Sequence, residues 1–259
     1  MRFAITREIS PAIERCALTH LARQSIDLDR ARRQHEAYEG RLRELGCAVV
    51  RLAADEAMPD SVFVEDVAVV FDEVGVITRP GAESRHIEIP AIAEALAPYR
   101  LLQSIQPPGR LDGGDVLTVG RQVFIGQTRR TNLAALRQMK DILNPYGYLV
   151  EGVAVDRCLH LKSAVSLVAD GCLLINPAWA PTDNFHAFRL ITTDPTEPFA
   201  ANALRIWNSV IYPSMFPKTV RRLEDEGIQI VAVDSSELAK AEGGVTCCSL
   251  IFEVPLSKA

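Results

Sequence analysis

The chain lacks several features that would place it in a common class. No apolar run reaches about 18 residues, and the N-terminal residues do not form an apolar segment followed by a small-residue cleavage site, so we expect neither a membrane span nor an export signal. Asp and Glu (33) outnumber Lys and Arg (28), and no basic block occurs. We therefore expect no binding to nucleic acid or to an anionic membrane.

Cysteine is scarce as well. The 6 cysteines are dispersed without CxxC spacing, and the HxH and HExxH spacings of common metal sites are absent. A disulfide scaffold is not expected in a chain of 259 residues, so the thiols are predicted to be reduced and the location cytoplasmic. No Pro/Gly/Ser-rich linker or break in composition divides the chain, which predicts a single domain over residues 1–259.

What the sequence does contain is a repeat. Polar or aromatic residues stand beside an apolar run at intervals of 49, 48, 42 and 45 residues: Phe63, Asp112, His160, Asn202 and Cys247. Strand–turn–strand patterns are predicted over 66–79, 115–127, 163–177 and 202–213. Helical spacing followed by a short strand is found over 30–52, 89–105, 131–153 and 216–233, whereas 178–193 fits least well because Pro and Asn interrupt it.

The two ends of the chain complete one further unit. Residues 3–6 are predicted to pair with residues 248–252, which gives five α/β units of two strands, a helix and a strand (ββαβ), closed by the terminal strands. A period of about 40–50 residues is typical of a propeller or a solenoid, and ends that complete one another favour a closed ring. The repeated positions would then meet near the axis.

Several of these positions carry reactive groups. Cys247 and Cys248 are predicted to be neighbours on a strand, so only one thiol would face the axis. His160 alternates with Leu159 and Leu161 and would point away from them. An isolated histidine or cysteine pair of this kind is usually structural, and only the repeat brings the thiol and the imidazole together.

Carboxylates gather at two of the same positions. The group consists of Asp60, Glu65, Asp66, Asp112 and Asp115. Such an anionic pocket suits a guanidinium, with bidentate pairing available, while a divalent metal ion is the competing interpretation. Arg85 and Arg130 follow the first two hairpins and are predicted to reach back over the pocket and hold a carboxylate.

Taken together, the motifs resemble the dimethylarginine dimethylaminohydrolase family of the guanidine-modifying (pentein) superfamily. The resemblance covers nearly the whole chain and rests on Pro59-Asp-Ser-Val-Phe-Val-Glu-Asp66, Thr78-Arg-Pro-Gly-Ala-Glu-Ser-Arg85, Leu111-Asp-Gly-Gly-Asp115, Arg130-Thr-Asn132, Leu159-His-Leu-Lys162, Ala200-Ala-Asn202 and Gly243-Gly-Val-Thr-Cys247. It implies a five-bladed α/β propeller with pseudo-fivefold symmetry. It also implies hydrolysis of N-omega-methylated arginines to citrulline and an alkylamine through a covalent cysteine intermediate, without a metal or another cofactor.

The resemblance also implies a role for each matching residue. The catalytic residues would be Cys247 as nucleophile, His160 as acid and base, and Asp112 as the carboxylate that orients the histidine and contacts the substrate. The substrate-binding residues would be Asp60, Phe63, Glu65 and Asp66 around the guanidinium, Arg85 and Arg130 on the α-carboxylate, and Leu18 in a flexible N-terminal lid. One departure is Glu242, which stands where relatives often have Asp. The implied partner is a small molecule, and a homodimer is allowed.

Three alternatives remain at this point. The first is an arginine deiminase or amidinotransferase of the same superfamily, although arginine deiminases usually carry an extra helical domain. The second is a catalytically inactive protein that binds a cationic amino acid. The third is a metal-dependent hydrolase.

Overall fold

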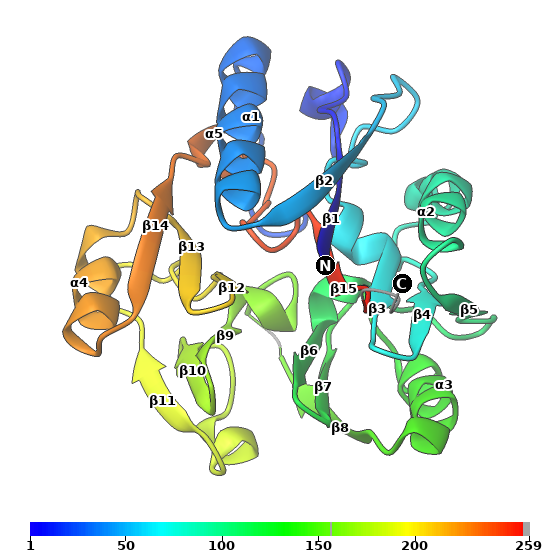
Figure 1. The fold of residues 1–259 in the computed structure, drawn as a ribbon. Helices are drawn as coiled ribbons and strands as arrows, with labels where there is room; N and C mark the ends of the chain where they lie inside the picture. Colours follow the sequence, from blue (N-terminus) through cyan, green and yellow to red (C-terminus); the bar gives the residue numbers. More distant parts are fainter. Residues whose placement is uncertain (156, 256–259) are drawn as a thin grey trace.

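The computed structural model describes residues 1–155 and 157–255. In these residues the chain has an α/β fold in which the strands form five three-stranded sheets (Figure 1). In each sheet the middle strand pairs antiparallel with one neighbour and parallel with the other. The sheets are β3 (Ala68–Val70), β4 (Val74–Ile77) and β5 (Leu101–Ser104); β6 (Val116–Val119), β7 (Gln122–Gln127) and β8 (Leu149–Ala154); β9 (Val165–Ala169), β10 (Cys172–Ile175) and β11 (Arg189–Thr192); β12 (Leu204–Ile206), β13 (Ser209–Pro213) and β14 (Gln229–Val233); and β15 (Leu250–Glu253), β1 (Arg2–Arg7) and β2 (Cys47–Leu52).

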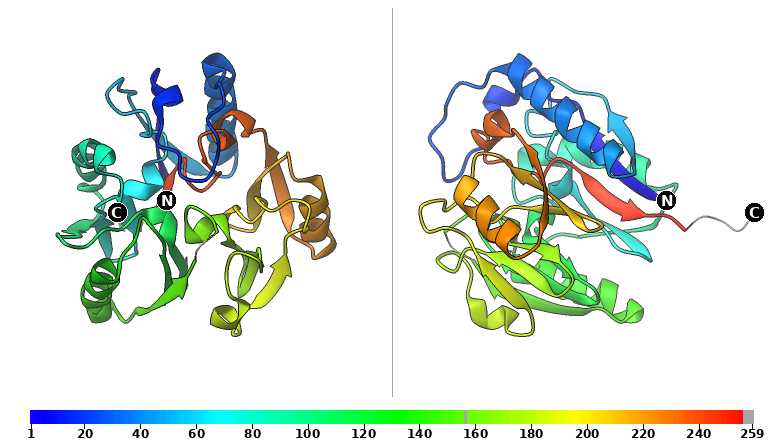
Figure 2. Two further views of the ribbon diagram at one scale, coloured as in Figure 1. Left: turned by 180° about the vertical axis from the view of Figure 1, so that it is seen from behind. Right: turned by 60° about the vertical axis from the view of Figure 1, so that its left-hand side comes forward.

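The parallel connection in four of the sheets contains an α-helix. These helices are α1 (Leu28–Glu44), α2 (Ile89–Leu96), α3 (Leu133–Leu143) and α4 (Pro217–Asp225). The side chains of Asp27 and Asn132 cap α1 and α3 by accepting hydrogen bonds from backbone N–H groups of the first turn. Seen from both sides, the helices lie at the outside of the molecule and the sheets surround a common centre (Figures 1 and 2).

The stretch 178–193, which fitted the repeat least well, is the exception in the structure too. The connection from β10 to β11 contains only the 3-10 helix η7 (Thr182–Phe185), which follows Pro181. Proline disfavours a helical conformation in the residue before it and removes a backbone donor, so a regular α-helix is not formed here.

The chain ends meet in one sheet, as predicted. β1 is the middle strand: residues 2–5 pair antiparallel with 250–253 of β15, and β1 runs parallel to β2. The N-terminal amine of Met1 also donates to the carbonyl of Val254 at 2.7 Å. The last sheet is therefore built from both ends of the sequence.

Three of the repeated positions occupy the same place in their units. Phe63, Asp112 and His160 each immediately precede a short 3-10 helix that leads into the first strand of a sheet, namely η2 (Val64–Val67), η4 (Gly113–Asp115) and η6 (Leu161–Ser163). η2 contacts η4, and η4 contacts η6. The repeat in the sequence thus brings side chains that are 49 and 48 residues apart into one neighbourhood.

Apolar side chains fill the space between these units and beneath the helices. One cluster, for example, packs Ile5 of β1 and Phe252 of β15 against Ile77 of β4 and Leu96 of α2. In the part of the chain that the structure describes, no helix is long and apolar enough to cross a membrane.

Candidate active site

A small cavity lies where the repeated positions converge. Its volume is about 20 Å³, and it is lined by Ala17, Asp60, Phe63, Asp66, Arg85, Arg130, Leu159, His160, Ala241, Glu242, Gly243 and Cys247. The fold thus brings a thiol, an imidazole, two aspartates and two guanidinium groups around one space. We refer to it as the catalytic cavity.

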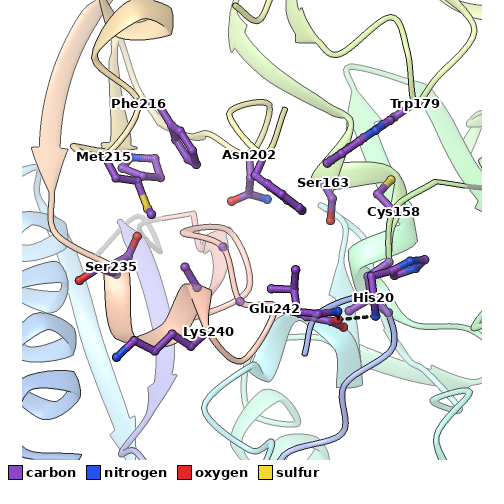
Figure 3. Close-up of a pocket in the computed structure, with 18 of the residues that line it drawn as sticks. His20, Cys158, Ser163, Trp179, Asn202, Met215, Phe216, Ser235, Lys240 and Glu242 are labelled. Carbon is purple, nitrogen blue, oxygen red and sulfur yellow. Dashed lines mark hydrogen bonds between the residues drawn. The ribbon is translucent and has the colours of Figure 1, made fainter. Parts of the chain in front are cut away.

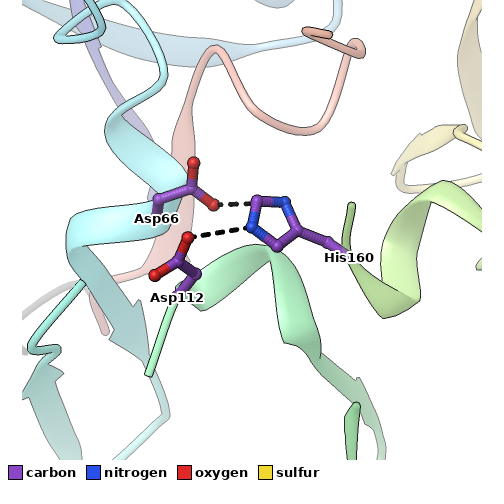
Figure 4. A group of neighbouring side chains, drawn as sticks. All are labelled: Asp66, Asp112 and His160. Atoms are coloured by element: carbon purple, nitrogen blue, oxygen red, sulfur yellow. Dashed lines mark hydrogen bonds and ion pairs between the residues drawn. The ribbon is translucent and has the colours of Figure 1, made fainter. Parts of the chain in front are cut away.

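His160 is held between two buried carboxylates (Figure 4). Its Nε2 is 2.9 Å from Oδ2 of Asp112, and its Nδ1 is 3.7 Å from Oδ1 of Asp66. Burial lowers the pKa of this imidazole, but Asp66, Asp112 and Asp115 outweigh that effect and raise the pKa to about 9. The histidine is therefore an imidazolium at neutral pH.

The imidazole of His160 can lie close to the backbone of η4 because residue 114 is a glycine. A Cβ atom at this position would lie 2.5 Å from Nδ1 of His160 and 2.8 Å from Oδ1 of Asp66. The backbone N–H of Gly114 also donates to that Asp66 oxygen at 3.1 Å. A residue with a side chain would push the imidazole away from both carboxylates.

Cys247 is partly exposed, whereas Cys248 beside it is buried. The backbone N–H of Gly244 donates to the Cys247 sulfur at 3.4 Å. Burial and the nearby carboxylates Glu65 and Asp66 raise the pKa of this thiol to about 12. In the free protein the sulfur is therefore a thiol at neutral pH.

The prediction that the two cysteines are neighbours on a strand is wrong. Residues 245–248 form a turn after the two glycines, and β15 begins only at Leu250. Ahead of this turn, Gly243 packs against the ring of Phe63, where a Cβ would lie 2.2 Å from the nearest ring atom, so no side chain fits at this position. The two thiols still face different surroundings, but for a reason other than strand alternation.

Glu65 has partners other than those predicted. Its carboxylate accepts hydrogen bonds from Lys162 Nζ at 2.5 Å and from Thr246 Oγ1 at 2.8 Å. It does not line the catalytic cavity but a separate one of about 240 Å³, which Lys162 also lines. Its contribution to the site in this structure is electrostatic: it disfavours the thiolate of Cys247.

Arg85 lines the catalytic cavity and also has several partners within the protein. Its guanidinium is buried and donates to Asp66 at 2.5 Å, to both oxygens of Glu88 at 3.0 and 2.8 Å, and to the carbonyls of Asp60 and Phe63. Its nitrogen donors are thus engaged by the protein itself. The opposite charges keep the pKa of Asp66 below its usual range, since His160 and Arg85 outweigh the effect of burial.

Arg130 is less tightly held. Its Nη2 donates to Thr19 Oγ1 at 3.1 Å, and its Nη1 lies 3.8 Å from Asp112 Oδ2. Because both contacts are single rather than bidentate, Arg130 retains donors for an acidic group in the cavity.

The N-terminal segment covers this site. We define the lid as residues 17–21; it contains Leu18, which packs partly buried on the core cluster that includes Phe63. The Ala17 N–H donates to Asp60 Oδ1 at 3.0 Å. Asp60 therefore serves both as a wall of the cavity and as a tether for the lid.

A second cavity of about 590 Å³ adjoins the first, and we call it the outer cavity (Figure 3). The two share Leu159, Glu242 and Gly243 in their linings. The outer cavity is bounded by apolar side chains that include Trp179, Phe199, Met215 and Phe216, and by His20 and Leu21 of the lid.

Asp66, Asp112 and His160 also form the one group, among the residues described, whose ligand atoms could hold a metal ion; these atoms lie within 4.8 Å of one another. The charge state argues against that use. A histidine ligand must be neutral, whereas here both ring nitrogens face carboxylates that stabilise the protonated form.

Comparison with known proteins agrees with the geometry. No family model matches the sequence. A dimethylarginine dimethylaminohydrolase of Streptomyces coelicolor is 38% identical over 250 residues, which cover 95% of each chain. The chain belongs to the dimethylarginine dimethylaminohydrolase family.

Solved structures of this family have the same fold. The chain superimposes with a TM-score of 0.91 on a Cys-to-Ser mutant of the Pseudomonas aeruginosa enzyme in complex with citrulline; the match is 33% identical and covers 96% and 98% of the two chains. A His-to-Gly variant of a dimethylarginine dimethylaminohydrolase, solved as an adduct with S-methyl-L-thiocitrulline, gives the same TM-score and identity and covers 96% and 99%.

Sequence reasoning missed several residues that build the site. Lys162 and Thr246 hold Glu65, and Glu88 holds Arg85. Lys162 and Thr246 belong to two of the motifs that carry the family resemblance, so the sequence already pointed to these positions. Glu88 lies three residues after Arg85, a spacing that permits an ion pair on a helical turn, and could have been found in this way.

Proposed function

We propose that this protein hydrolyses N-omega-methylated arginines to citrulline and an alkylamine. The observation that carries the proposal is the catalytic cavity, in which a thiol and an imidazolium meet among carboxylates. A guanidinium is a poor electrophile because its charge is shared by three nitrogens. Such a group requires a strong nucleophile, an acid for the departing amine, and anions that fix its plane, and Cys247, His160 and Asp66 supply these three in turn.

The reaction proceeds in two halves. In the first, the Cys247 thiol loses its proton to solvent as the guanidinium binds, and the sulfur adds to the central guanidinium carbon. His160 then gives its proton to the departing amine, and the carbon–nitrogen bond breaks to leave a thiouronium on the cysteine. In the second, the neutral His160 takes a proton from water, the hydroxide adds to the same carbon, and the carbon–sulfur bond breaks. The proton of the added hydroxyl passes to the departing sulfur as the carbonyl of citrulline forms, so the thiol and the imidazolium are restored, and the products are citrulline and methylamine or dimethylamine.

Substrate recognition is assigned to the charged groups around this centre. Asp66 and Asp60 face the cation, and Phe63 forms the apolar wall. Arg130 binds the α-carboxylate of the substrate, while Arg85 acts mainly by holding Asp66 in place. Asp112 is fully buried and acts through His160. No metal ion takes part in the reaction we propose.

We also propose that residues 1–259 form a single domain, a closed five-bladed α/β propeller with pseudo-fivefold symmetry. The five three-stranded sheets with equal strand order support it, as does the last sheet, which joins both chain ends. In such a ring the equivalent turns η2, η4 and η6 lie near the axis, where the catalytic cavity is found.

The test is citrulline release from asymmetric dimethylarginine, monomethylarginine and arginine at equal concentration, with and without a chelator. We expect citrulline and alkylamine in equal amounts from the methylated substrates, unaffected by chelation. Cys247→Ser should abolish turnover, and Cys248→Ser should retain it. A protein that binds methylated arginine without turnover, that prefers arginine and releases ammonia, or that loses activity on chelation would contradict the proposal.

A further inference from the structure

The lid and Glu242 make an unusual contact. Three consecutive backbone N–H groups of the lid converge on this one carboxylate: Thr19 donates at 3.1 and 3.0 Å, His20 at 2.5 Å and Leu21 at 2.6 Å. Figure 3 shows the contact between His20 and Glu242. Successive N–H groups that point to one side form a concave anion-binding site. Here the anion is a side chain from the opposite end of the sequence.

The backbone at Glu242 supports a specific role for this residue. Glu242 has φ 60°, a left-handed conformation that is unfavourable for a residue with a Cβ, and only Trp207 shares such a φ among the described non-glycine residues. Glu242 lies in the turn that follows the short helix α5 (Ser236–Ala239), where its N–H donates to the carbonyl of Ala239 at 3.1 Å and that of Gly243 to the carbonyl of Leu238 at 3.0 Å, and glycine is the usual left-handed residue in such a turn. A strained residue that is not glycine suggests that its side chain is needed.

The position of the contact relates it to the catalytic cavity. Glu242 lines both cavities, and His20 and Leu21, which it binds, line only the outer one. Ala17, at the other end of the lid, lines the catalytic cavity and is tethered by Asp60. The lid therefore forms part of the wall of both spaces, the catalytic cavity of about 20 Å³, which is too small for an arginine derivative, and the outer cavity of about 590 Å³.

We propose that Glu242 is a positioning residue that latches the lid over the catalytic cavity, and that release of this latch opens that cavity into the outer cavity. The outer cavity is then the route by which the substrate reaches Cys247. The link to substrate entry rests on the proposed function, whereas the latch itself is a property of the free protein.

The test uses variants of the full chain. Glu242→Gly removes the carboxylate and also suits the left-handed backbone, so the fold should be retained. Glu242→Gln keeps an acceptor oxygen but loses the charge. Glu94→Gln, on an exposed position of α2, is the matched control.

The first readout is amide hydrogen exchange of residues 19–21 without substrate. We expect exchange at least tenfold faster in Glu242→Gly, an intermediate increase in Glu242→Gln, and no change in the control, while the amides of α1 and β2 keep their rates. A merely structural role would accelerate exchange in those elements too. Exchange of residues 19–21 within twofold of the parent in Glu242→Gly would overturn the latch.

The second readout concerns access to the thiol. Iodoacetamide should modify Cys247 at least fivefold faster in Glu242→Gly than in the parent, and KM for methylated arginine should change more than kcat. An unchanged rate of alkylation despite faster lid exchange would contradict the opening of the cavity. If the parent releases no citrulline, the proposed function fails, but the exchange and alkylation results still decide the latch.

Discussion

At the scale of single residues, the charges around Cys247 determine how the reaction begins. Glu65 and Asp66 raise the pKa of the thiol, while Asp66 and Asp112 raise that of His160, so a thiol and an imidazolium coexist at neutral pH. A preformed thiolate–imidazolium pair would need the opposite order of these two values. A guanidinium substrate reverses the local charge and thereby promotes ionisation of the sulfur.

The pH dependence of alkylation tests whether the pKa of Cys247 lies above that of His160. In the free protein, the rate at which iodoacetamide modifies Cys247 should still rise above pH 9, and a small guanidinium ligand should shift the curve down by at least one pH unit. The activity should fall as the pH rises through about 9, because His160 then loses the proton that the departing amine requires. A free-protein titration centred below about 8.5, the value of an ordinary cysteine, and unaffected by the ligand, would contradict this mechanism.

The two arginines of the cavity should respond differently to mutation. Arg130→Ala should raise KM for amino-acid substrates by roughly 10- to 100-fold, since hydrogen bonds between charged groups contribute about 1.5–3 kcal/mol. Arg85→Ala leaves Glu88 buried without its cation and Asp66 with His160 alone, and this should destabilise the protein by about 3–5 kcal/mol.

Steady-state kinetics measure the effect of Arg130→Ala on KM, and thermal unfolding measures the effect of Arg85→Ala on stability. The exposed Arg137→Ala is the control and should alter neither. Alkylguanidines without a carboxylate should be affected little by Arg130→Ala. Equal losses for substrates with and without a carboxylate would mean that Arg130 acts on the fold instead.

At the scale of elements, the short turns before the first strands position the chemistry. Gly114→Ala should lower kcat at least 100-fold, because the added methyl group displaces His160 from Asp112 and Asp66. Thermal unfolding should change far less than activity. Gly120→Ala, in the turn between β6 and β7 where a Cβ meets no atom within 4 Å, controls for the loss of a glycine and should keep its activity, although its positive φ lowers stability. Comparable losses of kcat in both variants would refute the positioning role of Gly114.

The sequence predicted these elements well where local and repeated patterns agree. The helix predicted within 131–153 is α3, and residues 3–5 of the predicted strand 3–6 do pair with the C-terminal strand. The turn at 245–248 could not be predicted from local sequence patterns. The residues just ahead of it depend on a contact between Gly243 and the ring of Phe63, which lies 180 residues earlier in the chain. Side-chain pairs such as Glu65 with Lys162 likewise depend on three-dimensional contact, which a single sequence does not reveal.

At the scale of the whole molecule, the site depends on closure of the last sheet. β1 is the middle strand of that sheet, so deletion of residues 1–7 would leave β15 and β2 without their partner. None of the proposed catalytic or substrate-binding residues lies in 1–7. We nevertheless expect the deletion to abolish cooperative unfolding and activity, because the turn that carries Cys247 leads directly into β15.

A circular permutant provides the matched comparison. The N-terminal amine contacts Val254, so a short glycine-rich linker from residue 255 to Met1 preserves every strand pair of the sheet. New ends between the exposed Pro195 and Thr196 lie in the connection between β11 and β12, at two residues that line neither cavity. This permutant should retain cooperative unfolding and citrulline release within about tenfold of the parent. An active deletion variant, or a permutant that folds but loses activity, would show that closure of this sheet does not position the site.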